Sequence, residues 1–368
     1  MMSKINNPYR FLFAGGGTGG HLYPAIAVAD EIKRMQPEAQ ILFVGTRSKI
    51  EGRVVPKLGY RFKSIWIRGF ARKWTLTNLL FPLRLIVSMI QSIIISMKFK
   101  PRVAIGSGGY VAGPAVWGAS VMGANIMLIE PNSYPGITTR LLERQADEIH
   151  VAFEDSRKYL RMKSKVILSG NPIRTSLQLN KSVEVYTHFN LLPSIRTILI
   201  LGGSLGAGSI NKVVSDNLTE LLKLDIQIIW QTGSFYFDEY KNLHSDRVKV
   251  HSFIDEMDKA YSACDMVIAR AGASTISELA ALGLPVILIP SPNVAENHQY
   301  HNAKSLSDVG AAVIIEDKNL KENFLTAVST LIFDEEKLKD LSNNIKNFSK
   351  PDAANIIAKR AIKFAIAV

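Results

Sequence analysis

The sequence predicts an α/β protein of two Rossmann-like, doubly wound domains that face each other across a cleft. Short, β-rich apolar runs alternate with helical patterns along all 368 residues, which is typical of parallel sheets covered by helices on both faces. The first apolar run of each half is followed by a glycine-rich turn and then by a helical pattern. The length also exceeds what a single hydrophobic core usually serves.

The expected strands fall into two sets. In the first half we expect them at residues 11–14, 41–44, 103–105, 126–129, 148–151 and 166–168. In the second half we expect them at residues 197–201, 226–230, 248–251, 266–269 and 286–289. Asn171-Pro172 favours a turn, which gives domains at 1–170 and 171–350 and a helical tail at 351–368 whose packing partner stays open. Ligands of such sheets bind at the carboxyl ends of the strands, so the site is expected in the cleft.

Composition narrows the class of protein. One cysteine, Cys264, excludes a disulfide within the chain and a cysteine-built metal site, and it suits a reducing cytoplasm. Residues 1–13 have no apolar stretch of the length that a signal peptide needs. Residues 1–172 hold 24 Lys and Arg against 10 Asp and Glu, whereas residues 173–368 hold 20 against 22.

Within residues 47–102, 13 cationic side chains stand against one acid, Glu51. Such a basic face suits anionic lipid, a pyrophosphate-bearing substrate or nucleic acid. The apolar stretch at residues 76–97 contains Asn, Pro, Arg and Gln, which argue against a lipid-exposed span. We expect residues 85–97 to form a helix packed in the core. In residues 66–81, aromatic side chains and leucines alternate with cations, which favours peripheral contact with an anionic membrane.

Residues 15–21, Gly-Gly-Gly-Thr-Gly-Gly-His, are the most informative motif. A strand, a glycine turn and a helix N-terminus together form a site for a phosphate or a sugar, because the backbone is accessible and the helix dipole favours an anion. His21 adds a side chain that can take a proton near neutral pH. The spacing also matches a dinucleotide fingerprint. No acid follows the second expected strand, however, so an NAD site is disfavoured, and an NADP site would depend on Arg47 alone.

Three further turns repeat this chemistry. Residues 106–114 and 202–208 are glycine-rich, and residues 270–279 place Ser and Thr in the first turn of an expected helix. On that helix the carboxylate of Glu278 serves either a ribose diol or the helix dipole. His298 and His301 have no third ligand nearby, so no metal site is expected.

Together these motifs closely resemble those of the MurG family of bacterial glycosyltransferases. The matching runs keep the family's order over nearly the whole chain: GGGTGGH, GGYVAGP, EPN, GNPIRT, GGSLGA, FIDEM, RAGASTISE and HQYHNA. The resemblance implies the GT-B fold and inverting transfer of N-acetylglucosamine from UDP-N-acetylglucosamine to lipid I, undecaprenyl-pyrophosphoryl-N-acetylmuramoyl-pentapeptide, giving lipid II and UDP. It also implies a peripheral location at the cytoplasmic face of the cell membrane, cell-wall synthesis proteins as partners, and no essential metal or other cofactor.

The resemblance also implies binding residues. The positions expected to bind the nucleotide sugar from the second domain are Arg174, Ser204, Asn211, Ile254, Arg270, Ala273, Ser274, Thr275, Ile276, Ser277, Glu278, Gln299 and Asn302. Those expected to reach the donor from the first domain are Thr18, Gly19, Gly20 and Asn132. Among them, Ile254 would contact the uracil, Glu278 the ribose, and Ser204 with residues 273–277 the diphosphate.

The first domain would take the acceptor, with His21, Tyr110 and Glu130 as catalytic candidates. The acceptor hydroxyl must lose a proton as it attacks the anomeric carbon, and a base near neutral pKa assists that step. His21 and Glu130 are the candidate bases, and the glycine turn favours His21. The chain departs from the family at Ile129, Thr139 and Leu205, where histidine, asparagine and glutamine are usual.

Three alternatives stay open at this point. They are another UDP-sugar transferase or epimerase of the same fold, an NADP-dependent oxidoreductase, and a nucleic-acid-binding protein. The second glycine-rich domain disfavours the oxidoreductase. Only charge suggests nucleic acid and no recognisable motif supports it, so nucleic acid is not expected as a partner.

Overall fold

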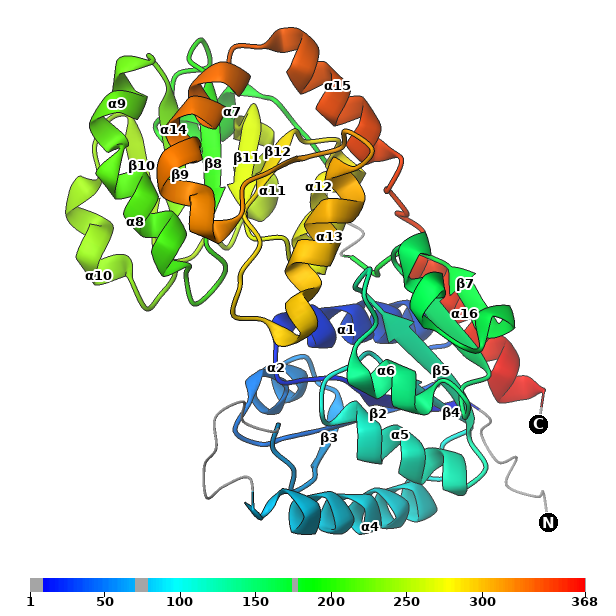
Figure 1. Ribbon diagram of the computed structural model, residues 1–368. Helices are drawn as coiled ribbons and strands as arrows, with labels where there is room; N and C mark the ends of the chain where they lie inside the picture. Colours follow the sequence, from blue (N-terminus) through cyan, green and yellow to red (C-terminus); the bar gives the residue numbers. More distant parts are fainter. Residues whose placement is uncertain (1–8, 70–78, 174–177, 368) are drawn as a thin grey trace. The chain divides into compact units, whose positions relative to one another are not determined.

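A computed structural model describes residues 9–69, 79–173 and 178–367 (Figure 1). The chain divides into two compact units, one formed by residues 1–174 with 350–368 and the other by residues 175–349. Each unit is built around one parallel sheet. The α/β class and the pair of doubly wound domains are therefore confirmed.

The first sheet has the order β3-β2-β1-β4-β5-β6-β7, and every pairing is parallel. The chain order reverses between β1 and β4, which lie side by side at its centre. The strands are β1 (Arg10–Ala14), β2 (Gln40–Gly45), β3 (Arg61–Ser64), β4 (Val103–Gly106), β5 (Asn125–Glu130), β6 (Glu148–Val151) and β7 (Val166–Leu168). The helices are α1 (Gly19–Met35), α2 (Ile50–Lys57), α4 (Phe81–Phe99), α5 (Ala112–Val121), α6 (Ile137–Leu142) and α16 (Ala353–Ile366), with 3-10 turns at Glu154–Tyr159 and Lys163–Lys165.

Apolar residues lie on both faces of this sheet, because successive side chains of a strand point to opposite sides. Phe11 and Phe13 of β1 join a core with α1 and α16. Leu12 and Ala14 of the same strand join a second core with α5. The sheet is thus covered by helices on both faces, and its carboxyl edge is left for the connecting loops.

The second sheet repeats the plan with the order β10-β9-β8-β11-β12-β13, again all parallel. Its chain order reverses between β8 and β11. The strands are β8 (Thr197–Leu201), β9 (Gln227–Gln231), β10 (Val248–His251), β11 (Met266–Ala269), β12 (Val286–Leu288) and β13 (Val313–Ile314). The helices are α7 (Val183–His188), α8 (Gly208–Asp216), α9 (Leu218–Lys223), α10 (Phe237–Tyr240), α11 (Met257–Ala263), α12 (Ala273–Leu282), α13 (His298–Ser307), α14 (Leu320–Leu331) and α15 (Glu335–Lys346), with 3-10 turns at Lys241–Leu243, Ala295–Asn297 and Asp317–Asn319.

All eleven expected strands are present, within one or two residues of their predicted ends. Two strands were missed, β3 and β13. Both are edge strands, and their residues are exposed or only half-buried, so neither shows the continuous apolar run that marks a central parallel strand.

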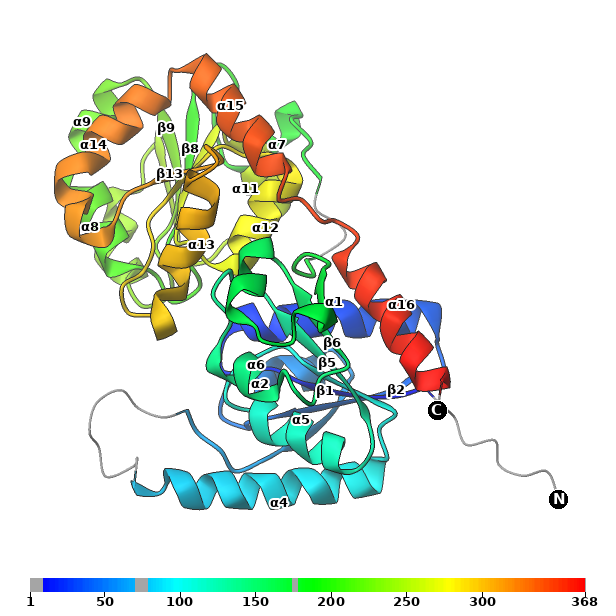
Figure 2. The same ribbon diagram turned by 45° about the vertical axis from the view of Figure 1, so that its right-hand side comes forward.

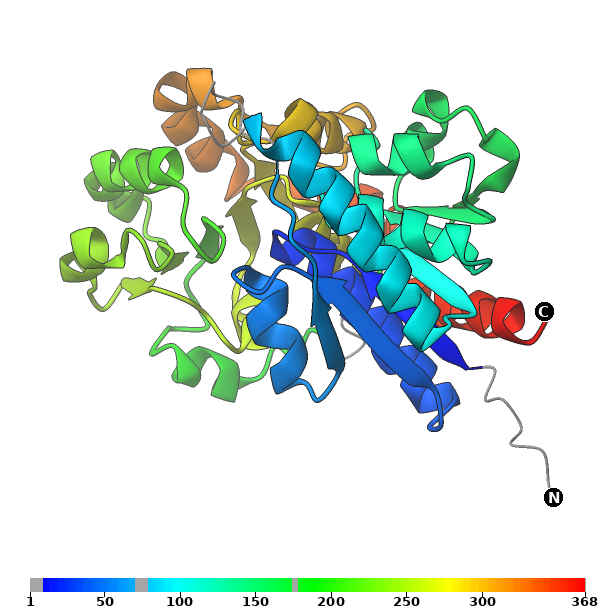
Figure 3. The same cartoon turned by 90° about the horizontal axis from the view of Figure 1, so that it is seen from below.

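Residues 85–97 form a helix, as expected, but the expectation that this helix is packed in the core is wrong. Helix α4 lies alongside α5, and the residues it buries are Ser88, Ser92, Ser96 and Phe99 (Figure 3). Leu85 and Ile95 pack partly against the core, whereas Leu83, Ile86, Ile90, Ile94 and Met97 are exposed. A Cβ on Gly118 of α5 would lie 2.8 Å from the Cβ of Ser92, so small residues on both helices allow this close approach.

The C-terminal helix belongs to the first unit. Figure 2 shows α16 beside α1, and the Asn355 amide of α16 donates to Glu31 Oε1 of α1 at 2.6 Å. Arg360 of α16 forms a two-pronged ion pair with Glu148 of β6, in which Nε lies 2.6 Å from Oε2. The last helix is therefore bound to the sheet that contains the first strand.

Candidate functional site

The first glycine turn lies at the carboxyl edge of the first sheet. β1 ends at Ala14 and α1 begins at Gly19 after Thr18. Gly17 has φ of +86°, a left-handed value that favours glycine. Its N–H donates to Oε2 of Glu51 at 3.0 Å, so a carboxylate of the protein itself occupies this donor. The N–H groups of Gly19 and Gly20 open the helix, where backbone donors have no acceptor in a preceding turn.

His21 is held in the first turn of α1. Its Nδ1 lies 2.9 Å from the carbonyl oxygen of Ser107, and the Ser107 hydroxyl donates to the His21 carbonyl at 2.6 Å. Because a carbonyl only accepts, Nδ1 must carry the proton in this contact, and the neutral ring has its lone pair on Nε2. Burial lowers the pKa of His21, and the hydrogen bond to Ser107 opposes that effect. The neutral form, which can accept a proton, is therefore favoured at neutral pH.

The turn after β4 packs against the first glycine turn. Gly108 and Gly109 have φ of +97° and +78°. A Cβ on Gly108 would lie 2.7 Å from His21 Nδ1, and a Cβ on Gly109 would overlap the carbonyl oxygen of Gly16. Glycine at these positions brings the two turns together and leaves room for the imidazole beside them.

Tyr110, the third catalytic candidate, is linked to the first glycine turn through Thr46 and Glu51. The Thr46 hydroxyl donates to Glu51 Oε1 at 2.6 Å and lies 3.4 Å from the Tyr110 hydroxyl. Burial raises the pKa of Tyr110; the hydrogen bond to Thr46 opposes this, and the Glu51 charge adds to it. Tyr110 therefore keeps its proton at neutral pH.

Sequence reasoning did not place Glu51 and Thr46 beside the candidate residues, where their hydrogen bonds put them. A signal for Glu51 was present, because it is the single acid among the cations of residues 47–102. Thr46 gave no such signal, since its partners are remote in the sequence or unmarked by any motif.

Glu130, the other candidate base, ends β5 and is almost fully buried. Its Oε2 accepts from the Thr139 hydroxyl at 2.7 Å and from the Gly136 N–H at 2.9 Å. Its Oε1 accepts from the N–H and the side-chain amide of Asn132 at 3.0 and 3.2 Å. Burial raises the pKa of Glu130, and these hydrogen bonds oppose it. Both oxygens are thus occupied in organising their own loop. The same loop joins the second glycine turn, since the Thr138 hydroxyl donates to the Gly109 carbonyl at 3.1 Å.

In the second unit, the turn between β8 and α8 contains Gly203 and Gly206 with φ of +82° and +94°. The next turn nests against it, because a Cβ on Gly233 would overlap the backbone of Gly206. The Ser204 carbonyl accepts from the Ser234 N–H at 3.1 Å, while the Ser204 residue itself is exposed. The backbone of this turn is therefore fixed and its serine is accessible.

Helix α12 starts at Ala273, directly after Gly272, and has no acidic residue in its first turn. The hydroxyl oxygen of Ser274 is buried and has no hydrogen-bond partner in the part of the chain that the structure describes. The Ser277 hydroxyl donates back to the Ala273 carbonyl at 2.8 Å. Thr275 lies in the same turn, half-buried, and Ile276 is buried. A positive helix end with an unpartnered hydroxyl suits an anion.

Glu278 follows on the same helix, where its carboxylate is oriented by a buried tyrosine. The Tyr261 hydroxyl donates to Glu278 Oε2 at 2.7 Å. Burial, and after it the Glu278 charge, raises the pKa of Tyr261 well above its ordinary value. Tyr261 thus remains a donor at any working pH and fixes one oxygen of Glu278.

Arg270 lies between β11 and α12, and its guanidinium hydrogen-bonds to residues of the second unit. Its Nη1 donates to Asp317 Oδ1 at 2.6 Å, and its Nη2 donates to the Ser209 hydroxyl at 2.7 Å. The Ser209 hydroxyl in turn donates to Asp317 Oδ1 at 2.7 Å. This triangle joins three loops at the carboxyl edge of the second sheet.

Asn211 and Asn302 are fully buried. Asn211 accepts from the Trp230 indole N–H at 3.0 Å and donates to the Thr232 carbonyl at 2.9 Å. The Asn302 amide donates to the Ala271 carbonyl at 3.2 Å. The structure places both asparagines behind the loops, where they brace the backbone.

Two further expected binding residues of the second unit are Ile254, in the loop after β10, and Gln299, in the first turn of α13. The N–H of Ile254 donates to Gln231 Oε1 at 3.0 Å, and Ile254 is buried. Gln299 Oε1 accepts from the Ser291 N–H at 2.9 Å. Arg174, the remaining expected position, lies outside the described residues. Within each unit, most of the expected residues thus lie on the loops after the strands or in the first turns of the helices that follow, while Asn211 and Asn302 are buried behind them.

The two units match two domains of one enzyme family. Residues 11–151 match the glycosyltransferase family 28 N-terminal domain, and residues 197–357 match the glycosyltransferase family 28 C-terminal domain.

The chain is also similar to proteins named UDP-N-acetylglucosamine--N-acetylmuramyl-(pentapeptide) pyrophosphoryl-undecaprenol N-acetylglucosamine transferase. The protein of that name from Flavobacterium psychrophilum is 45% identical, covering 96% of this chain and 97% of its own. The one from Christiangramia forsetii is 42% identical over the same shares. The crystal structure of Acinetobacter baumannii MurG has a TM-score of 0.76 at 26% identity, covering 97% of this chain and all of its own.

Proposed function

Because the chain belongs to glycosyltransferase family 28, we propose that it transfers N-acetylglucosamine from UDP-N-acetylglucosamine to lipid I and releases lipid II and UDP. The relatives described above are named for this transfer, and they match the chain over nearly their whole length. They are not named for the alternatives of an NADP-dependent oxidoreductase or a nucleic-acid-binding protein.

One structural observation supports this proposal most strongly. Glycine-rich or small-residue turns follow β1, β4, β8 and β11, the strands between which the chain order of each sheet reverses. Ligands of doubly wound sheets bind at this switch point, outside the carboxyl ends of the strands. The reaction needs two phosphate-bearing substrates, and each unit offers a switch point of its own.

We assign the donor to the second unit. The N-terminus of α12, with the unpartnered Ser274 hydroxyl, would hold the diphosphate together with Ser204. Glu278, oriented by Tyr261, would bind the ribose, and Ile254 would lie at the uracil. Charge that develops on the leaving UDP would be stabilised by the helix N-terminus.

We assign the acceptor to the first unit, with His21 as the base. The Ser107 carbonyl holds Nδ1 protonated, and the lone pair on Nε2 would take the proton of the attacking hydroxyl. Glu130 is a weaker candidate, because both of its oxygens are engaged by donors of its own loop. Its proposed task is to set the position of Asn132.

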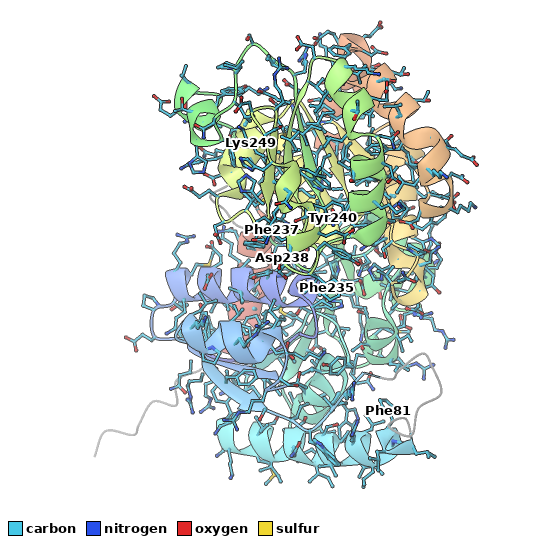
Figure 4. All side chains as sticks on the ribbon, turned by 90° about the vertical axis from the view of Figure 1, so that its left-hand side faces the viewer. Phe81, Phe235, Phe237, Asp238, Tyr240 and Lys249 are labelled. Carbon is cyan, nitrogen blue, oxygen red and sulfur yellow. The ribbon has the colours of Figure 1, made fainter. Side chains whose placement is uncertain are left out.

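Helix α4 supports a membrane location for the reaction. Among the described residues, α4 is the one helix that is long and apolar enough to cross a membrane, judged by length and composition alone. Only 17% of its apolar stretch is buried. Leu83, Ile86, Ile90, Ile94 and Met97 are 44–57% exposed and recur every three or four residues; we call them the α4 stripe. Figure 4 labels Phe81 at the start of this helix and shows side chains projecting from it.

Cations flank the α4 stripe. Arg84 lies over the Trp66 ring at 5.5 Å, and Lys98 lies in the last turn of α4. An apolar stripe edged by cations suits a helix that lies in the plane of an anionic membrane. We therefore propose peripheral attachment at the cytoplasmic face of the cell membrane, where a prenyl-anchored acceptor would be reached. Phe70, Arg72, Lys73 and Trp74 of the expected contact segment lie outside the described residues.

The test of the proposed function is calorimetric titration with UDP-N-acetylglucosamine, followed by an assay for lipid II with lipid I as acceptor. UDP-N-acetylgalactosamine and NADPH are the controls. Selective binding of the first nucleotide and formation of lipid II are expected. Uptake of NADPH in place of the sugar nucleotide would refute the proposal.

A further inference from the structure

We propose that Glu51 is a positioning residue for glycosyl transfer, which sets both the first glycine turn and Tyr110 through one buried carboxylate. The inference rests on the proposed function, because it names a residue that orders the acceptor side of that same site. Neither the glycine motifs nor the expected binding positions include Glu51.

The side-chain oxygens of Glu51 are enclosed by hydrogen-bond donors. Glu51 is 1% exposed and accepts from the Gly17 N–H, the Thr46 N–H and the Thr46 hydroxyl at 3.0, 3.0 and 2.6 Å. Among the ion pairs of the described residues, none includes Glu51. A buried polar group of this kind depends on its hydrogen bonds, so their geometry is strongly constrained.

The glycine turn is wrapped closely around this carboxylate. A Cβ on Gly16 would lie 2.5–2.8 Å from the Cδ and both oxygens of Glu51. Gly16 must therefore be glycine for the carboxylate to reach Gly17, whose φ of +86° directs the chain into α1. His21 lies in the first turn of that helix, so Glu51 acts on the proposed base through the backbone.

A second branch leads from Glu51 to Tyr110. The Thr46 hydroxyl donates its proton to Glu51, so its oxygen can accept from the Tyr110 hydroxyl, 3.4 Å away. The Tyr110 ring packs on the first turn, since a Cβ on Gly17 would lie 3.1 Å from its Cε1. One carboxylate thus orders a backbone turn and, through a threonine, the side chain that covers it.

The two branches can be separated by substitution. Glu51→Gln replaces one acceptor oxygen with an NH₂ group, which must face a donor and so breaks at least one branch. Thr46→Val removes only the hydroxyl and the Tyr110 branch, and Thr46→Ser restores that hydroxyl. Glu143→Gln is the matched control, because Glu143 is also buried and accepts a backbone N–H, that of Arg161, at 2.7 Å.

Three quantities are measured for each variant: kcat and KM for UDP-N-acetylglucosamine with lipid I, the affinity for UDP, and amide hydrogen exchange of residues 11–22. We expect Glu51→Gln to lower kcat about tenfold or more and to leave KM and the UDP affinity within about twofold. The reason is that an unpaired buried N–H group shifts the glycine turn of the first unit but not the second unit, to which UDP-N-acetylglucosamine is assigned. Exchange at residues 11–22 rises. Thr46→Val lowers kcat without that rise, Thr46→Ser restores kcat, and Glu143→Gln changes neither.

The contrary results are equally defined. A folded Glu51→Gln protein with wild-type kcat overturns the inference, as does an equal loss of kcat in Glu143→Gln. If Glu51→Gln does not fold, equal kcat values for Thr46→Val and Thr46→Ser overturn it. If the wild-type protein makes no lipid II, the proposed function fails by itself. Unchanged exchange at residues 11–22 in Glu51→Gln would then refute the positioning role separately.

Discussion

His21 and Glu130 are both ionisable side chains at the carboxyl edge of the first sheet, yet their hydrogen bonds give them different capacities. His21 donates from Nδ1 to a backbone carbonyl, which leaves Nε2 as a base. Glu130 uses both oxygens to accept from Asn132, Gly136 and Thr139. The first arrangement is suited to proton transfer and the second to holding a loop.

Replacing His21 with Ala should lower kcat by about 10²–10⁴-fold and leave UDP affinity unchanged, because a general base contributes about that much. Since burial lowers the pKa of His21, the wild-type rate should fall on the acid side with an apparent pKa below 6.5. That acid limb should be absent in His21→Ala. The measurement is kcat against pH with lipid I, with His188→Ala, an exposed histidine paired with Glu256, as control. A near-normal rate in His21→Ala would exclude it as the base.

Glu278→Ala should weaken UDP binding about tenfold to a hundredfold, the usual worth of hydrogen bonds to a charged group. Tyr261→Phe should cause a smaller loss, because it removes only the hydroxyl that orients the carboxylate. Calorimetry with UDP and with 2′-deoxy-UDP tests the ribose contact. Removal of both the 2′-hydroxyl and the carboxylate should cost less than the sum of the single effects. Strictly additive losses would show that Glu278 does not bind the 2′-hydroxyl.

At the scale of elements, α4 buries a face of small polar residues and exposes a stripe of apolar ones, the opposite of an ordinary amphipathic helix. Its sequence is apolar enough to suggest a core helix, but the face that meets α5 carries Ser88, Ser92 and Ser96. Small residues permit close helix contact with Gly118, and this leaves the larger apolar side chains outside. An exposed apolar stripe of this length marks an interaction surface.

The double substitution Ile90→Glu and Ile94→Glu should abolish binding to vesicles that contain anionic lipid, because it places two charges within the α4 stripe. The protein should stay folded, since both side chains are about half exposed. Vesicle flotation measures the binding, and circular dichroism checks the fold. Val309→Glu, at an exposed apolar position of the second unit, is the control and should bind as the wild type does. Unaltered flotation of the double variant would rule out the α4 stripe as the attachment surface.

At the scale of the whole molecule, the two units repeat one topology, and the last helix returns to the unit that contains the first strand. Arg360 of that helix pairs with Glu148, whose Oε2 also lies 3.1 Å from Nε2 of the buried His150. Burial would raise the pKa of Glu148, but the hydrogen bonds from His150 and Arg360 outweigh it and lower the pKa to about 2. The end of the chain is thus a stabilising part of the first unit.

Arg360→Ala should lower the free energy of unfolding at pH 7 by about 1–3 kcal/mol, because it removes the cationic partner of a buried carboxylate. The folded pKa of Glu148, about 2, lies below its ordinary value of 4.5, so the ionised group stabilises the fold above pH 4.5. This contribution is lost as pH falls from 4.5 toward 2, so the difference between variant and wild type should shrink over the same range.

Urea unfolding followed by circular dichroism measures this difference at each pH. Lys158→Ala, which removes an exposed pair with Asp155, is the control and should cost less than about 1 kcal/mol. A difference between Arg360→Ala and wild type that stays constant with pH would argue against the Glu148 linkage.

The sequence by itself determined every strand except β3 and β13, the two doubly wound units and the four turns at their switch points. These features are local: a buried parallel strand is a continuous apolar run, and glycine favours the positive φ found in the turns after β1, β4 and β8. Tertiary structure alone decided the partners of Glu51 and Glu130, the outward face of α4, the edge strands β3 and β13, and the unit on which α16 packs. These depend on contacts between residues far apart in the chain, such as Gly17 with Glu51 and Glu148 with Arg360, which no local pattern encodes.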